Sequence, residues 1–232
     1  APDEMDRVST AGYALGYVGG GILLALNLAW IMKPEWFFLP HGEGLTPSQA
    51  TLPTRLAFVS VAVWWLVFSL PLFRDVPEPP ATGSGRVSIG ETLRELGQTF
   101  RRLGQYRQAV LMLVAFLIYN DGIGTIIRMA TIYGTELGIG QGALIGAIMI
   151  VQFVGIPFAF LFGAFAHKIG AKRAIFLGLV VYGVISVVGY YMTTATHFFI
   201  LALLVGMVQG GTQALSRSLF ASMIPRERSA EF

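Results

Sequence analysis

Residues 109–134 read AVLMLVAFLIYNDGIGTIIRMATIYG, an apolar stretch of membrane-spanning length that nevertheless contains two charged side chains. An α-helix needs about 20 predominantly apolar residues to cross roughly 30 Å of hydrocarbon, and this stretch is long enough. A charged residue near the middle of such a helix costs about 2.5 to 3.5 kcal/mol on insertion scales. The stretch therefore predicts a membrane helix in which Asp121 and Arg128 face protein, water or a partner, and not lipid.

The whole chain has the composition of a membrane protein. Of its 232 residues, 54% are hydrophobic and 12% are charged, and its mean hydropathy is +0.65; these values lie outside the range that is usual for soluble domains. The apolar residues form continuous blocks, whereas a β-barrel would need alternating segments of roughly ten residues. The predicted fold class is all-α, a polytopic membrane helix bundle with six transmembrane helices. We expect these helices at residues 11–32, 56–73, 109–134, 142–166, 174–192 and 197–219.

The positions of lysine and arginine predict how the helices are oriented. Cytoplasmic loops of membrane proteins carry an excess of these residues. If the chain begins in the cytoplasm, thirteen of its sixteen Lys and Arg residues fall on the cytoplasmic side, and only Lys33 and Arg55 lie in outer loops. Both ends of this chain are therefore expected to be cytoplasmic, and the net charge of +3 needs no nucleic-acid partner.

Metal and disulfide chemistry have little support in the sequence. The chain contains no cysteine, which excludes disulfides and thiolate-bound metals. His41, His167 and His197 are far apart in the sequence and lie in different predicted connections. We therefore expect no bound metal and no cofactor. The acidic and polar first residues, APDEMDRVS, also predict no cleavable signal peptide.

The longest connection, residues 74–107, is predicted to have two parts. Its first part, RDVPEPPATGSGRVS, is rich in Pro, Gly and Ser and is typical of a linker. In its second part, Ser88 and Glu91 form a capping-box pattern and apolar residues follow at helical spacing. This predicts an amphipathic helix on the cytoplasmic membrane surface or under the bundle, with a target helix for a calmodulin-like protein as the alternative. The apolar positions are Ile89, Leu93, Leu96, Phe100, Leu103 and Tyr106.

Glycines recur every four residues within several predicted helices, which makes helix faces flat enough for close backbone approach. Packing between neighbouring helices is preferred over self-dimerisation, because any polytopic bundle uses such contacts. Pro157, with Gly155 beside it, is expected to bend the fourth helix. The repeats are Gly12, Gly16 and Gly20, then Gly138, Gly142 and Gly146, and finally Gly206 and Gly210.

The polar residues of the third predicted helix share one face. Asp121, Thr125 and Arg128 lie within about two helical turns. The two charged residues are separated by roughly 10 Å along the axis, too far for a direct ion pair unless flexible side chains or a substrate close the gap. Asn120-Asp121-Gly122 is also a poor helix interior, and a break there would free backbone groups that only a protein-lined cavity tolerates. The face lines either a polar cavity or a structural network with other helices.

Further polar side chains occur in the fourth and sixth predicted helices. Gln209, Gln213 and Arg217 recur every four residues in the sixth, and Gln152 lies near the centre of the fourth. Together with the third helix they describe a polar path through the hydrocarbon. No metalloprotease, hydrolase or paired-carboxylate motif accompanies this path, so an intramembrane enzyme would lack the acid and base groups that it needs.

The connection GAFAHKIGAKR, between the fourth and fifth predicted helices, resembles the cytoplasmic signature G-x-L-x-D-R-x-G-R-K of the major facilitator superfamily. Gly163, Gly170, Lys172 and Arg173 carry the resemblance. His167 stands where the family usually has Asp, which removes the acidic side chain of that position. The resemblance implies that these five residues form a cytoplasmic gate motif.

Three longer stretches resemble one branch of this superfamily, the branch related to the yeast vacuolar amino-acid effluxer. They are RVSTAGYALGYVGGGILLALNLA at 7–29, YNDGIGTIIRMATIYGTELGI at 119–139 and GMVQGGTQALSRSLFASMIPRERSAEF at 206–232. The resemblance implies a fragment that holds helices five to ten of a twelve-helix plan, with the missing helices of the full-length chain as partners. Residues 1–73 would be the last two helices of the N-terminal half, 74–107 the central cytoplasmic loop, and 108–232 the first four helices of the C-terminal half.

The resemblance also implies a secondary active transporter that moves a small polar solute across a lipid bilayer by alternating access. Amino-acid efflux and proton coupling are its specific expectations, in a cell (inner) membrane or a vacuole-type membrane. Asp121 is expected to be the coupling or substrate-amine group, Arg128 the carboxylate partner, and Lys172 with Arg173 the cytoplasmic latch. An intramembrane enzyme and a non-transporting membrane scaffold are the alternatives. The expected substrate or coupling site comprises Asp121, Asn120, Thr125, Arg128, Gln152, Gln209 and Gln213.

Overall fold

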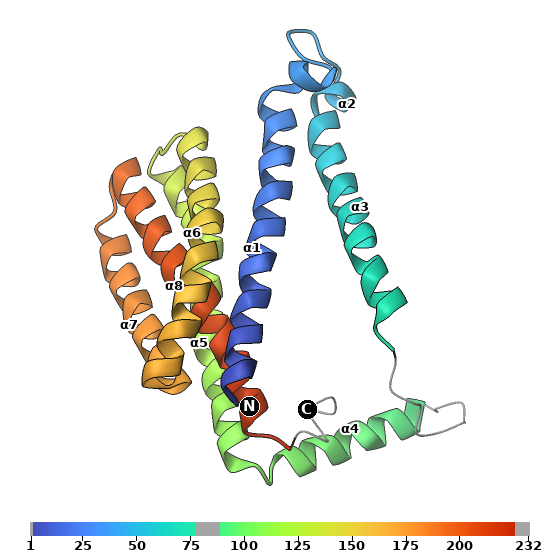
Figure 1. The fold of residues 1–232 in the computed structure, drawn as a ribbon. Helices are drawn as coiled ribbons and strands as arrows, with labels where there is room; N and C mark the ends of the chain where they lie inside the picture. Colours follow the sequence, from blue (N-terminus) through green and yellow to red (C-terminus); the bar gives the residue numbers. More distant parts are fainter. Residues whose placement is uncertain (1, 78–88, 226–232) are drawn as a thin grey trace. The chain divides into compact units, whose positions relative to one another are not determined.

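The computed structural model describes residues 2–77 and 89–225, which fold into helices without any strand (Figure 1). Six of the helices are long and apolar enough, by length and composition, to cross a membrane. The prediction of an all-α fold with six membrane helices is therefore confirmed. Each helix begins earlier than predicted, because the polar residues that flank its apolar core continue the helix into the interfacial region. The six are α1 (Pro2–Met32), α3 (Leu52–Asp75), α5 (Arg107–Glu136), α6 (Gln141–Ile169), α7 (Ala171–Tyr190) and α8 (Ala195–Ser222).

Three shorter helices lie in the described parts of the connections. η1 (Pro34–Phe37) and α2 (Pro47–Ala50) are found between α1 and α3, and a capping box at Thr46 starts α2. α4 (Ile89–Leu103) is the amphipathic helix that the sequence predicts before α5. Its predicted capping residue, Ser88, lies outside the described residues.

The chain divides into two compact units. One comprises Ala1–Gly19 and Ser88–Phe232, and the other comprises Gly20–Val87, so α1 contributes its first part to one unit and its second part to the other. In the second unit, Ser60 Oγ of α3 donates a hydrogen bond of 2.8 Å to Asn27 Oδ1 of α1. This bond joins two apolar helices through their polar side chains.

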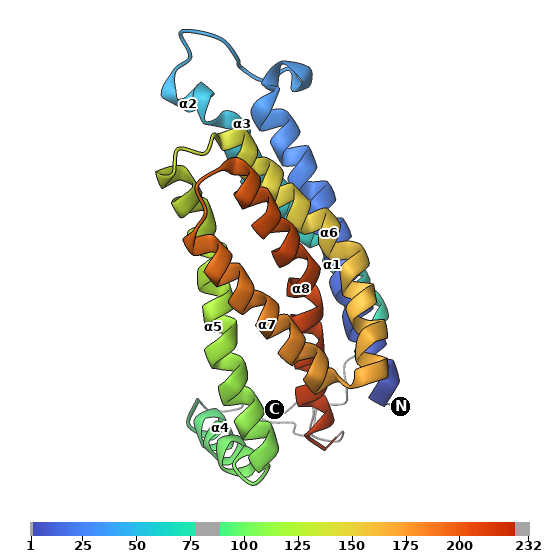
Figure 2. The ribbon, with the colours of Figure 1, turned by 90° about the vertical axis from the view of Figure 1, so that its left-hand side faces the viewer.

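In the first unit, α8 is the central helix (Figure 2). It packs most extensively against α6, then against α7, and it also contacts α5. Leu215, Thr212 and Ser216 are its largest fully buried side chains. Polar groups on α8 are therefore held within protein along much of the helix.

Glycines of α8 allow this close packing. A Cβ atom added at Gly206 would lie 3.2 Å from the backbone of α6, and one added at Gly210 would lie 2.6 Å from the ring of Tyr17. The predicted close approach is confirmed at these two glycines. Gly12 and Gly16 of α1, in contrast, have no atom of the described residues within 4 Å of an added Cβ atom, so residues 2–77 and 89–225 do not pack on this face.

The first part of α1 packs against α6 and α8 through three buried side chains. Thr10, Ala14 and Tyr17 are buried. The Tyr17 ring lies between Gly155 of α6 and Gly210 of α8, and a Cβ atom at Gly155 would lie 2.9 Å from the Cζ atom of that ring. The glycines that permit the contact thus belong to the partner helices and not to α1.

The weak helix former Asn120-Asp121-Gly122 and the predicted bend position Pro157 both lie inside continuous helices. α5 continues through Asn120-Asp121-Gly122, and α6 continues through Pro157. α5 keeps its backbone hydrogen bonds because hydrocarbon offers no replacement partners, and this outweighs weak local helix propensity. Pro157 has no N–H to donate, and the turns on either side of it continue α6. The polar face of α5 is therefore presented on a regular helix.

Candidate functional site

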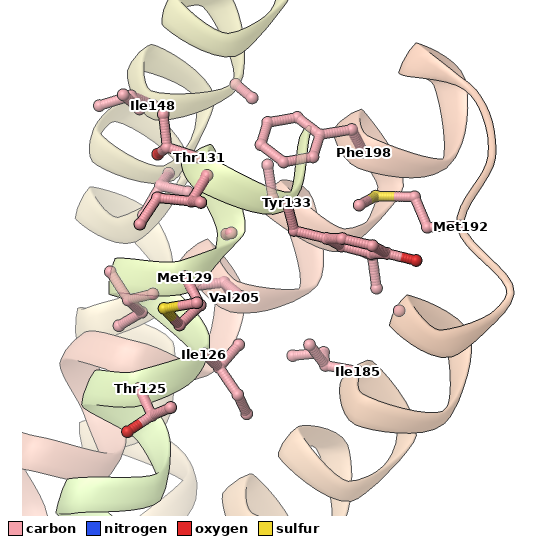
Figure 3. A pocket seen from close by; sticks show the side chains of 18 of the residues that line it. Thr125, Ile126, Met129, Thr131, Tyr133, Ile148, Ile185, Met192, Phe198 and Val205 are labelled. Carbon is pink, nitrogen blue, oxygen red and sulfur yellow. The ribbon is translucent and has the colours of Figure 1, made fainter. Parts of the chain in front are cut away.

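A pocket of about 690 Å³ lies between α5, α6, α7 and α8 (Figure 3). Three of the predicted site residues line it: Thr125 from α5, Gln152 from α6 and Gln209 from α8. The structure therefore brings together part of the predicted set, on three different helices.

The walls of this pocket are mainly apolar. In Figure 3, Ile126 of α5 and Ile185 of α7 face each other, and Tyr133 reaches from α5 toward Met192 and Phe198. A concave apolar site with a small number of polar groups is the usual form of a small-molecule site. The polar groups would then fix the orientation of a bound solute.

Gln209 supplies a polar atom that lacks a partner. Its Oε1 atom is buried and accepts no hydrogen bond within the described part of the chain. Leaving a buried acceptor unsatisfied costs about 1–3 kcal/mol. Because Gln209 lines the pocket, a rotation of its side chain that turns Oε1 toward a hydrogen-bond donor of a ligand would recover that cost.

A second group of polar side chains connects α1, α5 and α8. Tyr13 donates through its hydroxyl to Gln213 Oε1 at 3.1 Å, and Gln213 Nε2 donates to Asn120 Oδ1 at 3.4 Å. The Arg217 guanidinium lies over the Tyr13 ring, with 5.2 Å between Cζ and the ring centroid, which is a cation–π geometry. Asn120 and Gln213, both predicted site residues, therefore hydrogen-bond each other and do not line the pocket.

The sequence interpretation missed the residues that α1 contributes to this group. Ser9 Oγ donates to the Ala214 backbone oxygen at 2.9 Å; Tyr13 follows one helical turn later, and Tyr17 one turn after that. Polar side chains at four-residue steps in an apolar helix form a stripe on one face. This four-residue spacing is the sequence signal from which these residues could have been predicted.

Asp121 and Arg128 form an ion pair on an exposed face of α5. Arg128 Nη2 lies 3.8 Å from Asp121 Oδ1, and the two side chains are 70% and 83% exposed, respectively. Helical side chains lean toward the N-terminus, and the guanidinium folds back over Gly124, where an added Cβ atom would lie 3.2 Å from both terminal nitrogens. The axial separation is wide, as predicted, and the flexible arginine side chain closes it.

The charged pair and the pocket adjoin each other at Thr125. This residue is about one helical turn from each charged residue, and it lines the pocket, whereas neither Asp121 nor Arg128 does. The candidate site therefore consists of an apolar pocket with one unpaired buried acceptor and a charged helix face beside its rim.

The predicted gate motif surrounds a very short turn. α6 and α7 are joined by one residue, Gly170, whose φ of +90° favours glycine. His167 in the last turn of α6 and Lys172 and Arg173 in the first turn of α7 are exposed. A Cβ atom at Gly163 would lie 2.5 Å from a side-chain oxygen of α1. Turn geometry and close packing thus explain the two glycines.

Known proteins resemble this chain along almost its whole length. The family described as "Vacuole effluxer Atg22 like" matches residues 2–232. A Bacillus subtilis (strain 168) protein described as an uncharacterized MFS-type transporter, YxiO, is 36% identical over 229 residues, which cover 99% of this chain and 52% of the relative. Autophagy-related protein 22-1 of Penicillium rubens is 25% identical over 258 residues, which cover 97% of this chain and 40% of the relative.

The chain spans about half the length, or less, of these curated relatives. No solved structure matches it. The relatives and the six long apolar helices identify an integral membrane protein. Because the family match extends through all six of these helices, the chain belongs to the Atg22-like vacuole effluxer family.

Proposed function

We propose that the full-length protein is a secondary active transporter that moves a small polar solute across the bilayer by alternating access. The family match and the description of the bacterial relative support transport. In the proposed plan, residues 1–73 hold the last two helices of the N-terminal half, 74–107 the central cytoplasmic loop, and 108–232 the first four helices of the C-terminal half. Both ends of this chain then lie in the cytoplasm.

The observation that carries the proposal is the position of an apolar pocket beside a charged helix face. A membrane scaffold would be expected to pair its intramembrane polar groups with one another. Gln209 Oε1 instead is buried without a partner among the described residues, and the Asp121–Arg128 ion pair is itself largely exposed. These features support a solute site over a purely structural network.

In this proposal, Asp121 binds the ammonium group of the solute and Arg128 binds its carboxylate. An exposed ion pair contributes only about 0–1 kcal/mol, so a solute that offers better partners to both groups can replace their mutual contact. Gln209 accepts a hydrogen bond from the solute, and Gln152 and Thr125 are further hydrogen-bonding groups on the pocket wall. We propose amino-acid efflux as the activity, with Asp121 as the proton-coupling residue.

The contact between α1 and the helices α6 and α8 would join the two halves of the transporter. Tyr17 is held between Gly155 and Gly210, so alternating access requires this contact to loosen on one side of the cycle. Lys172 and Arg173 would latch the cytoplasmic side of the cell or vacuole-type membrane.

Transport of radiolabelled amino acids by the full-length protein in proteoliposomes, with and without an imposed pH gradient, tests the proposal. Asp121→Asn should lower gradient-driven transport by about tenfold or more, which corresponds to losing roughly 1.4 kcal/mol of interaction. Asp75→Asn, at the exposed end of α3, is the matched control and should transport normally.

Each alternative gives a different result in the same assay. Unchanged transport by Asp121→Asn would reject the site. The absence of saturable transport of any common amino acid would reject the activity and favour a scaffold. Recovery of a chemically altered solute would favour an intramembrane enzyme.

A further inference from the structure

The apolar face of α4 is exposed along most of its length. Leu93, Leu96 and Phe100 are 64%, 54% and 67% exposed. Their spacing of three and four residues places them on one side of the helix. An exposed row of large apolar side chains marks a surface that needs an apolar partner.

The C-terminal end of α4 fixes the direction of this face. Leu103 belongs to the same face but is only 8% exposed, because it packs with Ala109 at the start of α5 and with Ile224 after α8. In Figure 1, α4 leads into the start of α5 and runs across the direction of that helix. The apolar face therefore turns toward the side from which the membrane-length helices rise, as in a helix that lies in the plane of a membrane surface.

Basic residues border the apolar face. α4 contains three arginines against two glutamates, and Arg94 and Arg101 are exposed on the same flank, seven residues apart. Arginines at a membrane surface bury their stems and hold their charged ends at headgroup level. Anionic phospholipids attract such residues. The shape and the charge of α4 thus match an anionic lipid surface.

We propose that α4 lies in the membrane interface, with Leu93, Leu96 and Phe100 at the boundary of headgroups and acyl chains and its arginines on anionic phospholipids. Packing under the helices of this chain would cover the same three side chains, which its described residues leave exposed. A calmodulin-like partner would have to enclose a face that points to the membrane side. The proposal does not depend on transport activity.

Site-directed spin labelling tests the position of the helix. The chain contains no cysteine, so a nitroxide can be attached at a single introduced cysteine in the full-length protein, once any cysteine outside this chain is replaced by serine. In lipid nanodiscs, oxygen concentrates among acyl chains and a nickel chelate stays in water. The ratio of oxygen to nickel accessibility should be several-fold higher for Leu96→Cys than for Gln98→Cys, which is exposed on the opposite side of α4.

Two outcomes of this experiment would overturn the proposal. Equal ratios at Leu96→Cys and Gln98→Cys would place α4 in water. Strong immobilisation at Leu96→Cys with low access to both reagents would show that protein, whether the bundle, a second copy or another partner, covers the face.

The lipid headgroup is tested by comparing nanodiscs of phosphatidylcholine alone with nanodiscs that also contain phosphatidylglycerol. The ratio at Leu96→Cys should rise with the anionic lipid, and the double change Arg94→Gln and Arg101→Gln should abolish that rise. Arg74→Gln at the exposed end of α3 is the charge-matched control and should keep it. The role of anionic lipid would be rejected if the accessibility ratio at Leu96→Cys did not rise while both arginines are present. It would also be rejected if the ratio still rose after both arginines were replaced.

Discussion

Replacement of Gly210 by alanine should destabilise the packing of α1 against α8. The new Cβ atom would lie 2.6 Å from Tyr17 Cε2, and the ring cannot move away because Gly155 confines it from α6. Overpacking of this kind costs about 1–3 kcal/mol. The change also gains about 0.5–1 kcal/mol, because alanine is favoured over glycine in a helix.

Gly183→Ala in α7 is the matched control, since an added Cβ atom there meets no atom of the described residues within 4 Å. Both changes share the gain in helix propensity, so the difference between them isolates the packing cost of about 1–3 kcal/mol. The shift per kcal/mol falls with chain length, so at about 1–2 °C per kcal/mol in the full-length protein Gly210→Ala should melt roughly 1–6 °C below Gly183→Ala. The fraction of full-length protein that stays monodisperse in detergent after heating measures this difference.

A second background separates the Tyr17 contact from other causes. Tyr17→Ala removes the ring and will itself destabilise the protein, but Gly210→Ala added to it should then stabilise by about 0.5–1 kcal/mol, as the control does. Equal melting of Gly210→Ala and Gly183→Ala in the parent protein would refute the reasoning. So would a penalty for Gly210→Ala that survives the loss of the Tyr17 ring.

Two further predictions concern polar residues. Gln213→Leu should destabilise the protein by about 1–2 kcal/mol in detergent unfolding, because it leaves Tyr13 and Asn120 without their partner. Gln209→Leu, one turn away, removes a buried acceptor that has no partner among the described residues and should be neutral or stabilising. Equal losses of stability in the two variants would contradict this assignment. Gly124→Ala places a Cβ atom 3.2 Å from the Arg128 nitrogens, whereas at Gly122 it meets nothing within 4 Å. Gly124→Ala should therefore loosen the exposed Asp121–Arg128 ion pair and raise the apparent solute affinity in proteoliposomes by at most about fivefold. Gly122→Ala should leave the affinity unchanged. Identical affinities of the two variants would show that the ion pair does not compete with the solute.

The six membrane helices could be predicted because the thickness of the bilayer sets their length and apolar composition. The amphipathic character of α4 was equally accessible, since it follows from the spacing of residues such as Leu93 and Phe100 along one segment. The direction in which α4 faces could not be predicted, because it depends on the packing of Leu103 with Ile224, which is distant in the sequence.

The partners of the polar residues could not be predicted for a related reason. Tyr13 and Gln213 are 200 positions apart and meet only because α1 and α8 pack in a particular register. The geometry of Asp121 and Arg128 depends on the reach of one side chain over Gly124, which helix spacing alone does not give. Helix positions were thus readable from local pattern, whereas contacts required the packed bundle.

The single-residue junction at Gly170 limits how α6 and α7 can move. Two helices tied this tightly cannot slide past each other along their axes; they pivot as one hairpin about their shared corner. α6 carries Gln152 on one side of the pocket, and α7 carries Ile185 on another. A solute that displaces Gln152 would therefore also move Ile185 on α7. The pocket would change shape by rotation of the α6–α7 hairpin as one body instead of by independent side-chain adjustments.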